Sequence, residues 1–186
     1  MKPLALLLLL SVAAPAAEQT VQYSVRGLFQ PDRKAFLINA AMGLEGCRLV
    51  EVNYDAARAT FTYDDETQVF KKVKPDQILQ QIDTQIRKLT NHCFTLLQPG
   101  TLPAAGWTRI DFNIEGLDCL GCSYGAYSAV ASLEGVDHAT ASFRDGRLTA
   151  FIDPAKTSRG ALSEVLKKKE IKVVEASSKK ESQPEN

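Results

Sequence analysis

The chain has 186 residues, and its 22 Lys and Arg balance 22 Asp and Glu, so the formal charge is zero. This balance argues against a nucleic-acid-binding protein, which needs an excess of basic residues on one face. An apolar fraction of 45% with 24% charged residues is typical of a globular protein. Four cysteines are too few for a disulfide-rich scaffold of this length, but they suffice for one thiol site.

The first 17 residues have the order of a secretory signal peptide. Lys2 provides a positive start, residues 4–12 form an apolar run, and small residues follow. The run is well short of the ~20 residues that a membrane span requires. We therefore predict cleavage after Ala16 or Ala17. The mature protein is expected to be periplasmic or secreted, with no membrane span, in a compartment where disulfides persist.

An internal repeat divides the rest of the chain. Residues 21–28 match residues 110–117 at an offset of 89, and the offset holds without a gap as far as Gly46 and Gly135. Such self-similarity indicates a duplicated structural unit. The predicted domain organisation is a first domain at residues 18–98, a linker rich in Pro and Gly at 99–106, a second domain at 107–176 and a disordered polar tail at 177–186.

Both repeats show the same order of patterns. Period-two alternation marks half-buried strands, and apolar spacings of three and four mark helices. The expected elements of the first repeat are strands at 21–25, 49–54, 59–63 and 94–97 with helices at 31–44 and 75–89. Those of the second are strands at 110–114, 139–143, 148–152 and 171–174 with helices at 120–133 and 158–169. The order β-α-β-β-α-β predicts an α+β fold of two tandem ferredoxin-like sandwiches, each with both helices on one face.

A Cys-x-x-Cys sequence lies where the first strand of the second repeat ends and its first helix begins. Cys119 and Cys122 at this spacing can turn both sulfurs toward one point. Free N–H groups and the positive helix end favour thiolates there. Asp118 adds a negative charge, which opposes thiolate formation and attracts cations. His138, the one histidine of this repeat, is expected at the opposite end of the domain.

Two convergent thiolates with no third protein ligand suit a soft ion in an open, low-coordinate site, whereas structural zinc usually needs four ligands. We predict Cys119 and Cys122 as the metal ligands, with Cu(I) favoured and Hg(II), Zn(II) and Cd(II) as alternatives. Low coordination leaves room for an incoming thiolate. The expected partner is therefore a metal-donor or metal-acceptor protein with exposed thiolates.

The second repeat resembles the heavy-metal-associated domain family, found in copper chaperones, copper-exporting ATPases and the periplasmic mercury-binding protein. The family signature is Gly-Met-x-Cys-x-x-Cys after the first strand and Gly-Val beyond the first helix. Gly116, Cys119 and Cys122 match, and Gly135-Val136 stands at the second element. Over residues 107–176 the resemblance implies the binding and transfer of soft metal ions, with the two cysteines as ligands.

Two departures from this pattern affect the interpretation. Leu117 replaces the signature Met, a volume-conserving change at an expected packing position. In the first repeat, Gln30 and Arg33 occupy the positions of the two cysteines, so this copy resembles the family in fold only. It is not expected to bind metal at that loop, and packing on the second repeat and docking of a partner both stay open as its role. Lys169 and its two preceding lysines are expected near the metal loop, as a solvated helix end or as a counter-charge.

The remaining cysteines are expected to be unrelated to the site. Cys47 and Cys93 fall at opposite edges of the predicted sheet, so a disulfide between them is not expected, and each is interpreted as a small buried apolar residue. His92 precedes Cys93, but neighbours in a strand point to opposite faces, which argues against a metal pair.

Three functions are compatible with these residues. The favoured hypothesis is an exported carrier or scavenger of soft metal ions. The second is a thiol-disulfide redox protein that uses the same pair, and the third is a non-catalytic interaction module in which Cys119 and Cys122 are oxidised. A catalytic Ser-His-Asp set, a phosphate-binding glycine loop and paired catalytic carboxylates are not recognisable, so no enzyme is predicted.

Overall fold

The computed structural model describes residues 18–100 and 106–174. The predicted signal peptide, the tail and most of the linker lie outside the described residues. In the part of the chain that the structure describes, no helix combines the length and the apolar character needed to cross a membrane.

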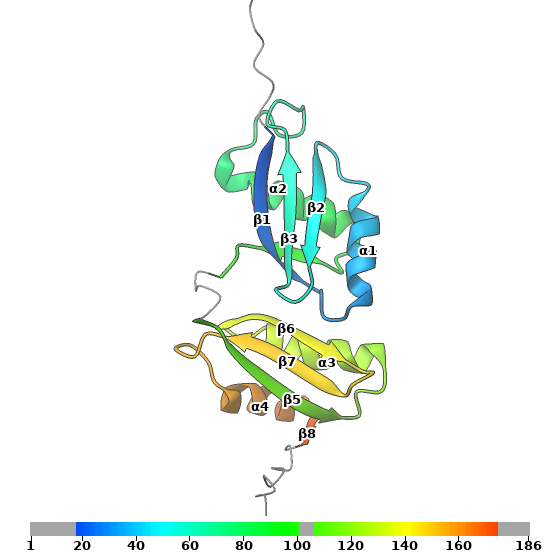
Figure 1. Ribbon diagram of the computed structural model, residues 1–186, viewed down its shortest axis with the longest axis vertical. Helices are drawn as coiled ribbons and strands as arrows, with labels where there is room; N and C mark the ends of the chain where they lie inside the picture. The colour runs from blue at the N-terminus through cyan, green and yellow to red at the C-terminus, as the bar shows by residue number, and fades with distance from the viewer. Residues whose placement is uncertain (1–17, 101–105, 175–186) are drawn as a thin grey trace, which may run out of the picture.

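The first repeat forms a four-stranded antiparallel sheet with strand order β2-β3-β1-β4 (Figure 1). Its elements are β1 (Gln19–Arg26), α1 (Asp32–Ala41), β2 (Cys47–Asn53), β3 (Arg58–Tyr63), a 3-10 turn (Pro75–Gln77), α2 (Ile78–Leu89) and β4 (Thr95–Leu97). Leu37 of α1 and Ile82 and Ile86 of α2 share one buried cluster with the inward-facing Phe61 of β3, so both helices pack on the same face of the sheet. The predicted fold of this repeat is confirmed.

The second repeat has the same topology, with strand order β6-β7-β5-β8. Its elements are β5 (Thr108–Glu115), α3 (Leu120–Ala131), β6 (Val136–Ser142), β7 (Arg147–Ile152), α4 (Arg159–Lys168) and β8 (Lys172–Val174). Ser158 caps α4 by accepting a hydrogen bond from the Ala161 N–H. The predicted tandem of ferredoxin-like sandwiches is therefore confirmed, with strand ends that differ from the sequence-based ranges by one to three residues at most positions.

The two repeats are packed together by the loop between β1 and α1 (Figure 1). Phe29 of this loop is 1% exposed and belongs to the buried cluster of the second repeat. Its ring stacks on Tyr127 of α3 at 5.1 Å between centroids and contacts Tyr124 at 5.6 Å. Of the two roles left open for the first repeat, the structure shows packing on the second.

Small residues in the second sheet provide the space for this ring. Ala139, Ala141 and Ala150 are buried in one cluster with Phe29, whereas the first sheet has Leu49, Val52 and Phe61 at the positions with matching strand pairing. A close-packed interior leaves no void of that size, so the missing side-chain volume has to be filled from outside the domain. The ring of Phe29 supplies part of this volume.

Hydrogen bonds hold the loop against β6, which is an edge strand of its sheet. The Ala141 N–H donates to the Phe29 carbonyl at 3.0 Å, and the Gln30 side-chain amide donates to the Ala141 carbonyl at 3.1 Å. The Tyr127 hydroxyl accepts from the Gly27 N–H at 2.7 Å. Edge strands carry unpaired backbone groups that invite other chains to pair, and the loop covers those of β6 at Ala141.

A polar cluster supports the same interface beside the loop. Asp137, whose side chain is 4% exposed, accepts two hydrogen bonds from Arg58 at 2.9 and 3.0 Å. His138 contacts the Asp137 carboxylate and the Asp55 carbonyl, and its ring stacks on Phe151. Burial raises the pKa of the Asp137 carboxyl, but the bonds from His138 and Arg58 outweigh it and the pKa lies below its ordinary value.

We expect Phe29→Ala to lower the free energy of unfolding by about 3–5 kcal/mol, because it removes buried apolar surface and leaves a cavity. Urea unfolding followed by fluorescence of Trp107, the single tryptophan of the chain, reports on the second repeat. Phe36→Ala is the matched control, since Phe36 is 42% exposed and its truncation is expected to cost much less. Equal losses for the two variants would contradict the role assigned to Phe29.

The lowered pKa of Asp137 predicts that the interface between the repeats loses stability in acid. The pKa of Asp137 is lower in the folded protein than in the unfolded chain, so its carboxylate stabilises the fold at pH values above about 4, the ordinary pKa of an Asp side chain. This contribution is lost as the pH falls through the folded pKa. We expect Asp137→Asn to cost about 2–3 kcal/mol near neutral pH. The difference from the wild type, measured by urea unfolding, is expected to shrink as the pH falls below the ordinary carboxyl pKa of about 4. A difference that stays constant with pH would show that the carboxylate charge is irrelevant.

Candidate metal centre

The Cys-x-x-Cys loop is built by a turn between β5 and α3. Gly116 has a φ of +80°, a conformation that side chains with a Cβ rarely adopt, and it redirects the chain out of the sheet. Leu117 then anchors the loop in the core with 4% exposure, so its predicted packing role is confirmed. With this anchor in place, Asp118 and Cys119 stand exposed at the tip of the loop.

Cys119 is the N-cap of α3. Its Sγ accepts a hydrogen bond from the Cys122 N–H at 3.0 Å, in the position that a Ser or Asp oxygen takes in other helices. The positive end of the helix dipole favours negative charge at this point. The local structure therefore favours a thiolate once Cys119 is reduced.

The two sulfurs converge, as their spacing predicts. The structure describes them as a disulfide between Cys119 and Cys122, with 5.2 Å between the Cα atoms. Metal ions bind thiolates and not a disulfide, so this pair has to be reduced before it can act as a ligand set. The disulfide interpretation left open in the sequence analysis is the state that the structure shows.

Asp118 places a carboxylate beside the two sulfurs. Its Oδ1 lies 3.4 Å from the Cys122 Sγ, and the donor atoms of Asp118, Cys119 and Cys122 lie within 4.8 Å of one another. The sequence placed Asp118 beside Cys119 but could not show on which side its carboxylate lies. Two thiolates alone suit Cu(I), whereas an added carboxylate oxygen makes the set more suitable for Zn(II) or Cd(II).

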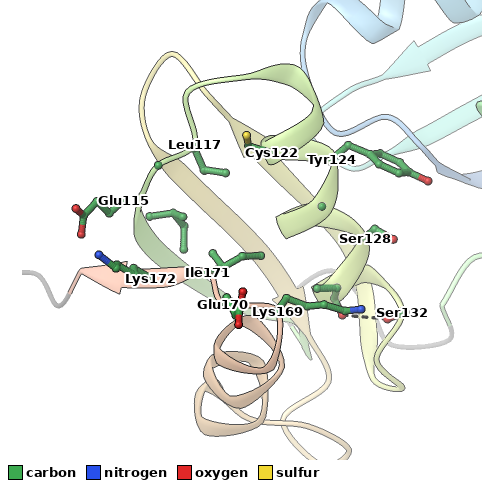
Figure 2. Close-up of a pocket in the computed structure, with 14 residues that line it drawn as sticks. Glu115, Leu117, Cys122, Tyr124, Ser128, Ser132, Lys169, Glu170, Ile171 and Lys172 are labelled. Carbon is green, nitrogen blue, oxygen red and sulfur yellow. Dashed lines mark hydrogen bonds between the residues drawn. The ribbon is translucent and has the colours of Figure 1, made fainter.

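An open groove of about 760 Å³ adjoins the site between α3 and the segment from α4 to β8 (Figure 2). Cys122 and Leu117 lie at one end, Ile171 lines its middle, and Lys169 lies at the far end beside Ser132. Lys169 thus shares the groove with Cys122 but does not lie at the sulfurs. The helix-end interpretation of this lysine run fits its other members, Lys167 and Lys168, which close the last turn of α4.

The matching loop of the first repeat is built for other contacts. Gln30, at the position of Cys119, is 3% exposed and bonded to the second repeat. Arg33, at the position of Cys122, donates to the Gly27 carbonyl at 3.0 Å, and its guanidinium lies 4.8 Å from the ring centre of Phe94. Neither side chain offers a soft ligand atom, and both make hydrogen bonds or ring contacts inside the protein.

Cys47 and Cys93 are free thiols, as expected, but only one is sheltered. Cys47 is partly buried against the first core, whereas Cys93 is exposed, so the buried interpretation of Cys93 is wrong. Asn91 and His92 have positive φ values of 48° and 62°, and this turn leaves Cys93 at the surface just before β4. His138 lies at the interface between the repeats and not at the cysteine pair, as its predicted position implies.

The two free thiols are expected to differ in reactivity. Burial raises the pKa of the Cys47 thiol to about 11, so the thiolate that attacks an alkylating reagent is scarce. Iodoacetamide followed by mass spectrometry of the folded, unreduced protein is expected to modify Cys93 at least about ten times faster. Similar rates in denaturant are the control, and similar rates in the folded protein would contradict the burial of Cys47.

No family model and no curated protein sequence matches the chain. Solved structures that match include the CopZ metallochaperone, at 22% identity over 36% of this chain and 100% of that one, with a TM-score of 0.35. The N-terminal soluble domains of Bacillus subtilis CopA match at 20% identity over 86% of this chain and 95% of theirs, with a TM-score of 0.35. Oxidised MerP from Ralstonia metallidurans CH34 matches at 21% identity over 37% of this chain and 99% of its own, with a TM-score of 0.34. The β-α-β-β-α-β order of both repeats is the fold that the resemblance to heavy-metal-associated domains implies, and the likeness is one of fold.

Proposed function

We propose that the protein is an exported carrier or scavenger of soft metal ions, which holds one ion between the thiolates of Cys119 and Cys122. The observation that carries the proposal is the convergence of two sulfurs and one carboxylate on an exposed loop at a helix N-terminus. Export rests on the predicted signal peptide. The ion is cargo, bound in one compartment and released to a partner.

The geometry of the loop favours exchange of the ion over permanent storage. Asp118 and Cys119 are exposed and Cys122 is partly exposed, so an incoming thiolate can reach a bound ion. Two soft ligands satisfy Cu(I), which we propose as the cargo, and leave a coordination position for the thiolate of a metal donor or acceptor. Hg(II) fits the same two ligands, while Zn(II) and Cd(II) would also use the Asp118 carboxylate.

A redox role is the second candidate, because the structure describes the pair as a disulfide. A thiol-disulfide exchange protein would reduce or oxidise partner disulfides through a mixed disulfide at the more exposed sulfur. A general base beside the pair would favour such a role. Of the two histidines of the chain, His138 lies at the interface between the repeats and His92 in the turn before β4, so neither is placed there.

We expect the fully reduced protein to bind one Cu(I) per chain and the oxidised protein to bind none at this site. Titration against a Cu(I) chelator of known affinity measures both, and Cys119→Ser or Cys122→Ser is expected to weaken binding by at least about 100-fold. Cys93→Ser is the matched control, because Cys93 is an exposed free thiol that is not part of the Cys-x-x-Cys loop. Full affinity in the loop variants would overturn the carrier proposal.

Two further measurements separate the candidate functions. Asp118→Asn is expected to leave Cu(I) affinity nearly unchanged and to weaken Zn(II) and Cd(II) binding by about 10-fold or more. Reduction of insulin by the protein at rates above those of a free dithiol would support the redox function instead. A pair that resists reduction in the native protein would leave only the non-catalytic interaction module.

A further inference from the structure

The disulfide between Cys119 and Cys122 joins two sulfurs with different surroundings. The Cys119 Sγ accepts a hydrogen bond from the Cys122 N–H at 3.0 Å, at the N-terminal end of α3. The Cys122 Sγ instead lies 3.4 Å from the Asp118 Oδ1. A thiol that reduces a disulfide attacks one sulfur and releases the other, so this difference bears on how the pair is reduced.

The surroundings of Cys119 favour its release. A sulfur leaves a disulfide more readily where the negative charge that it takes up is stabilised. On Cys119 this charge would form opposite a backbone N–H and at the positive end of the helix dipole. A hydrogen bond to an ionised acceptor is roughly twice as strong as one between neutral groups, so the bond from the Cys122 N–H strengthens as the disulfide breaks.

The Asp118 carboxylate opposes the release of Cys122. If Cys122 were the leaving sulfur, a second negative charge would form 3.4 Å from the Asp118 Oδ1, and the two charges would repel. If Cys122 is attacked instead, its sulfur stays neutral as part of a mixed disulfide with the attacking thiol. Both neighbours of the disulfide therefore favour the same direction of cleavage.

Solvent access allows this direction. Cys119 is exposed and Cys122 is partly exposed, so a thiol can reach either residue. Cys122 also lies at one end of the open groove of about 760 Å³ beside α3 (Figure 2). Exposure alone gives Cys119 a small advantage as the attacked residue, and the stabilisation of the leaving sulfur acts against it.

We propose that a dithiol reductant opens the pair by attack of its thiolate on the Cys122 Sγ, with Cys119 as the leaving thiolate. The new S–S bond joins the reductant to Cys122, and the electron pair of the broken bond stays on the Cys119 Sγ. The second thiol of the reductant gives its proton to water and attacks the reductant's own sulfur in the mixed disulfide. Cys122 is released as a thiolate, the reductant becomes a disulfide, and two electrons have passed to the pair.

The position of Cys119 explains why the reductant needs two thiols. Its thiolate stays three positions from Cys122 in the chain and can close the original disulfide again. A reaction within one molecule is faster than a reaction with a second molecule of a monothiol. A second thiol on the bound reductant also reacts within the complex and competes with this closure. The proposal rests on the proposed function for its purpose, because it supplies the two thiolates that hold the ion, but no step of it involves the ion.

The test identifies which cysteine the thiol attacks. The oxidised full chain is treated with 2-mercaptoethanesulfonate, a monothiol that forms the mixed disulfide, and free thiols are capped with N-ethylmaleimide at the earliest times. Fragment ions in mass spectrometry distinguish Cys119 from Cys122. We expect the probe on Cys122 and the maleimide on Cys119 in at least about 10-fold excess over the reverse arrangement.

Two protein variants and a second reagent make the result specific. Asp118→Asn removes the charge beside Cys122 and is expected to lower the excess by about 5-fold. Glu66→Gln, at a side chain of the first repeat that is 65% exposed, is the matched control and is expected to leave the excess unchanged. Dithiothreitol is expected to reduce the pair completely at a thiol concentration at which the monothiol leaves most of it as the disulfide.

The outcomes separate this proposal from the proposed function. A probe found mainly on Cys119 or equally on both cysteines would overturn the proposal, and so would a pair that forms no mixed disulfide. An unchanged excess in Asp118→Asn would overturn the role of the carboxylate. If protein reduced with a phosphine binds no Cu(I) while the probe is on Cys122, the carrier proposal fails and the direction of cleavage stands. Cu(I) binding with the probe on Cys119 gives the reverse result.

Discussion

The insertion of Phe29 into the second repeat is the contact on which the arrangement of the two repeats depends. One ring, 1% exposed, completes the core of a domain to which it does not belong in sequence. The alanines of β6 and β7 leave a space that close packing does not allow to stay empty, and the loop that fills it also covers an edge strand. Arg58 and Asp137 add a buried charge pair beside the ring.

The duplication has given one loop position two uses. In the second repeat the loop between the first strand and the first helix carries Cys119 and Cys122, with their sulfurs at an exposed helix end. In the first repeat the same loop carries Phe29 and Gln30, which are buried against the neighbour. The cysteine loop is thus open to solvent, whereas its counterpart in the first repeat is buried in the contact between the repeats.

The same packing fixes the surroundings of the helix that begins at the cysteine loop. Tyr124 and Tyr127, which contact Phe29, lie on the helix that begins at the cysteine pair. The first repeat thus contacts the first two turns of that helix from the side, while the loop itself stays open to solvent. The disulfide and the nearby Asp118 carboxylate lie within a few residues of each other at this exposed helix end.

Features that depend on neighbours in the chain were predictable from the sequence. Period-two strands, helical spacings and the repeat at offset 89 determine the fold of both domains, and the spacing of Cys119 and Cys122 at a helix start determines the candidate site. The tertiary structure alone decided the position of the Asp118 carboxylate, the exposure of Cys93 and the docking of Phe29. These depend on contacts between residues far apart in the chain or on side-chain directions, which local periodicity does not encode. Ala139, Ala141 and Ala150 stand where the first repeat has larger residues, and this difference was the one sequence signal of missing core volume in the second repeat.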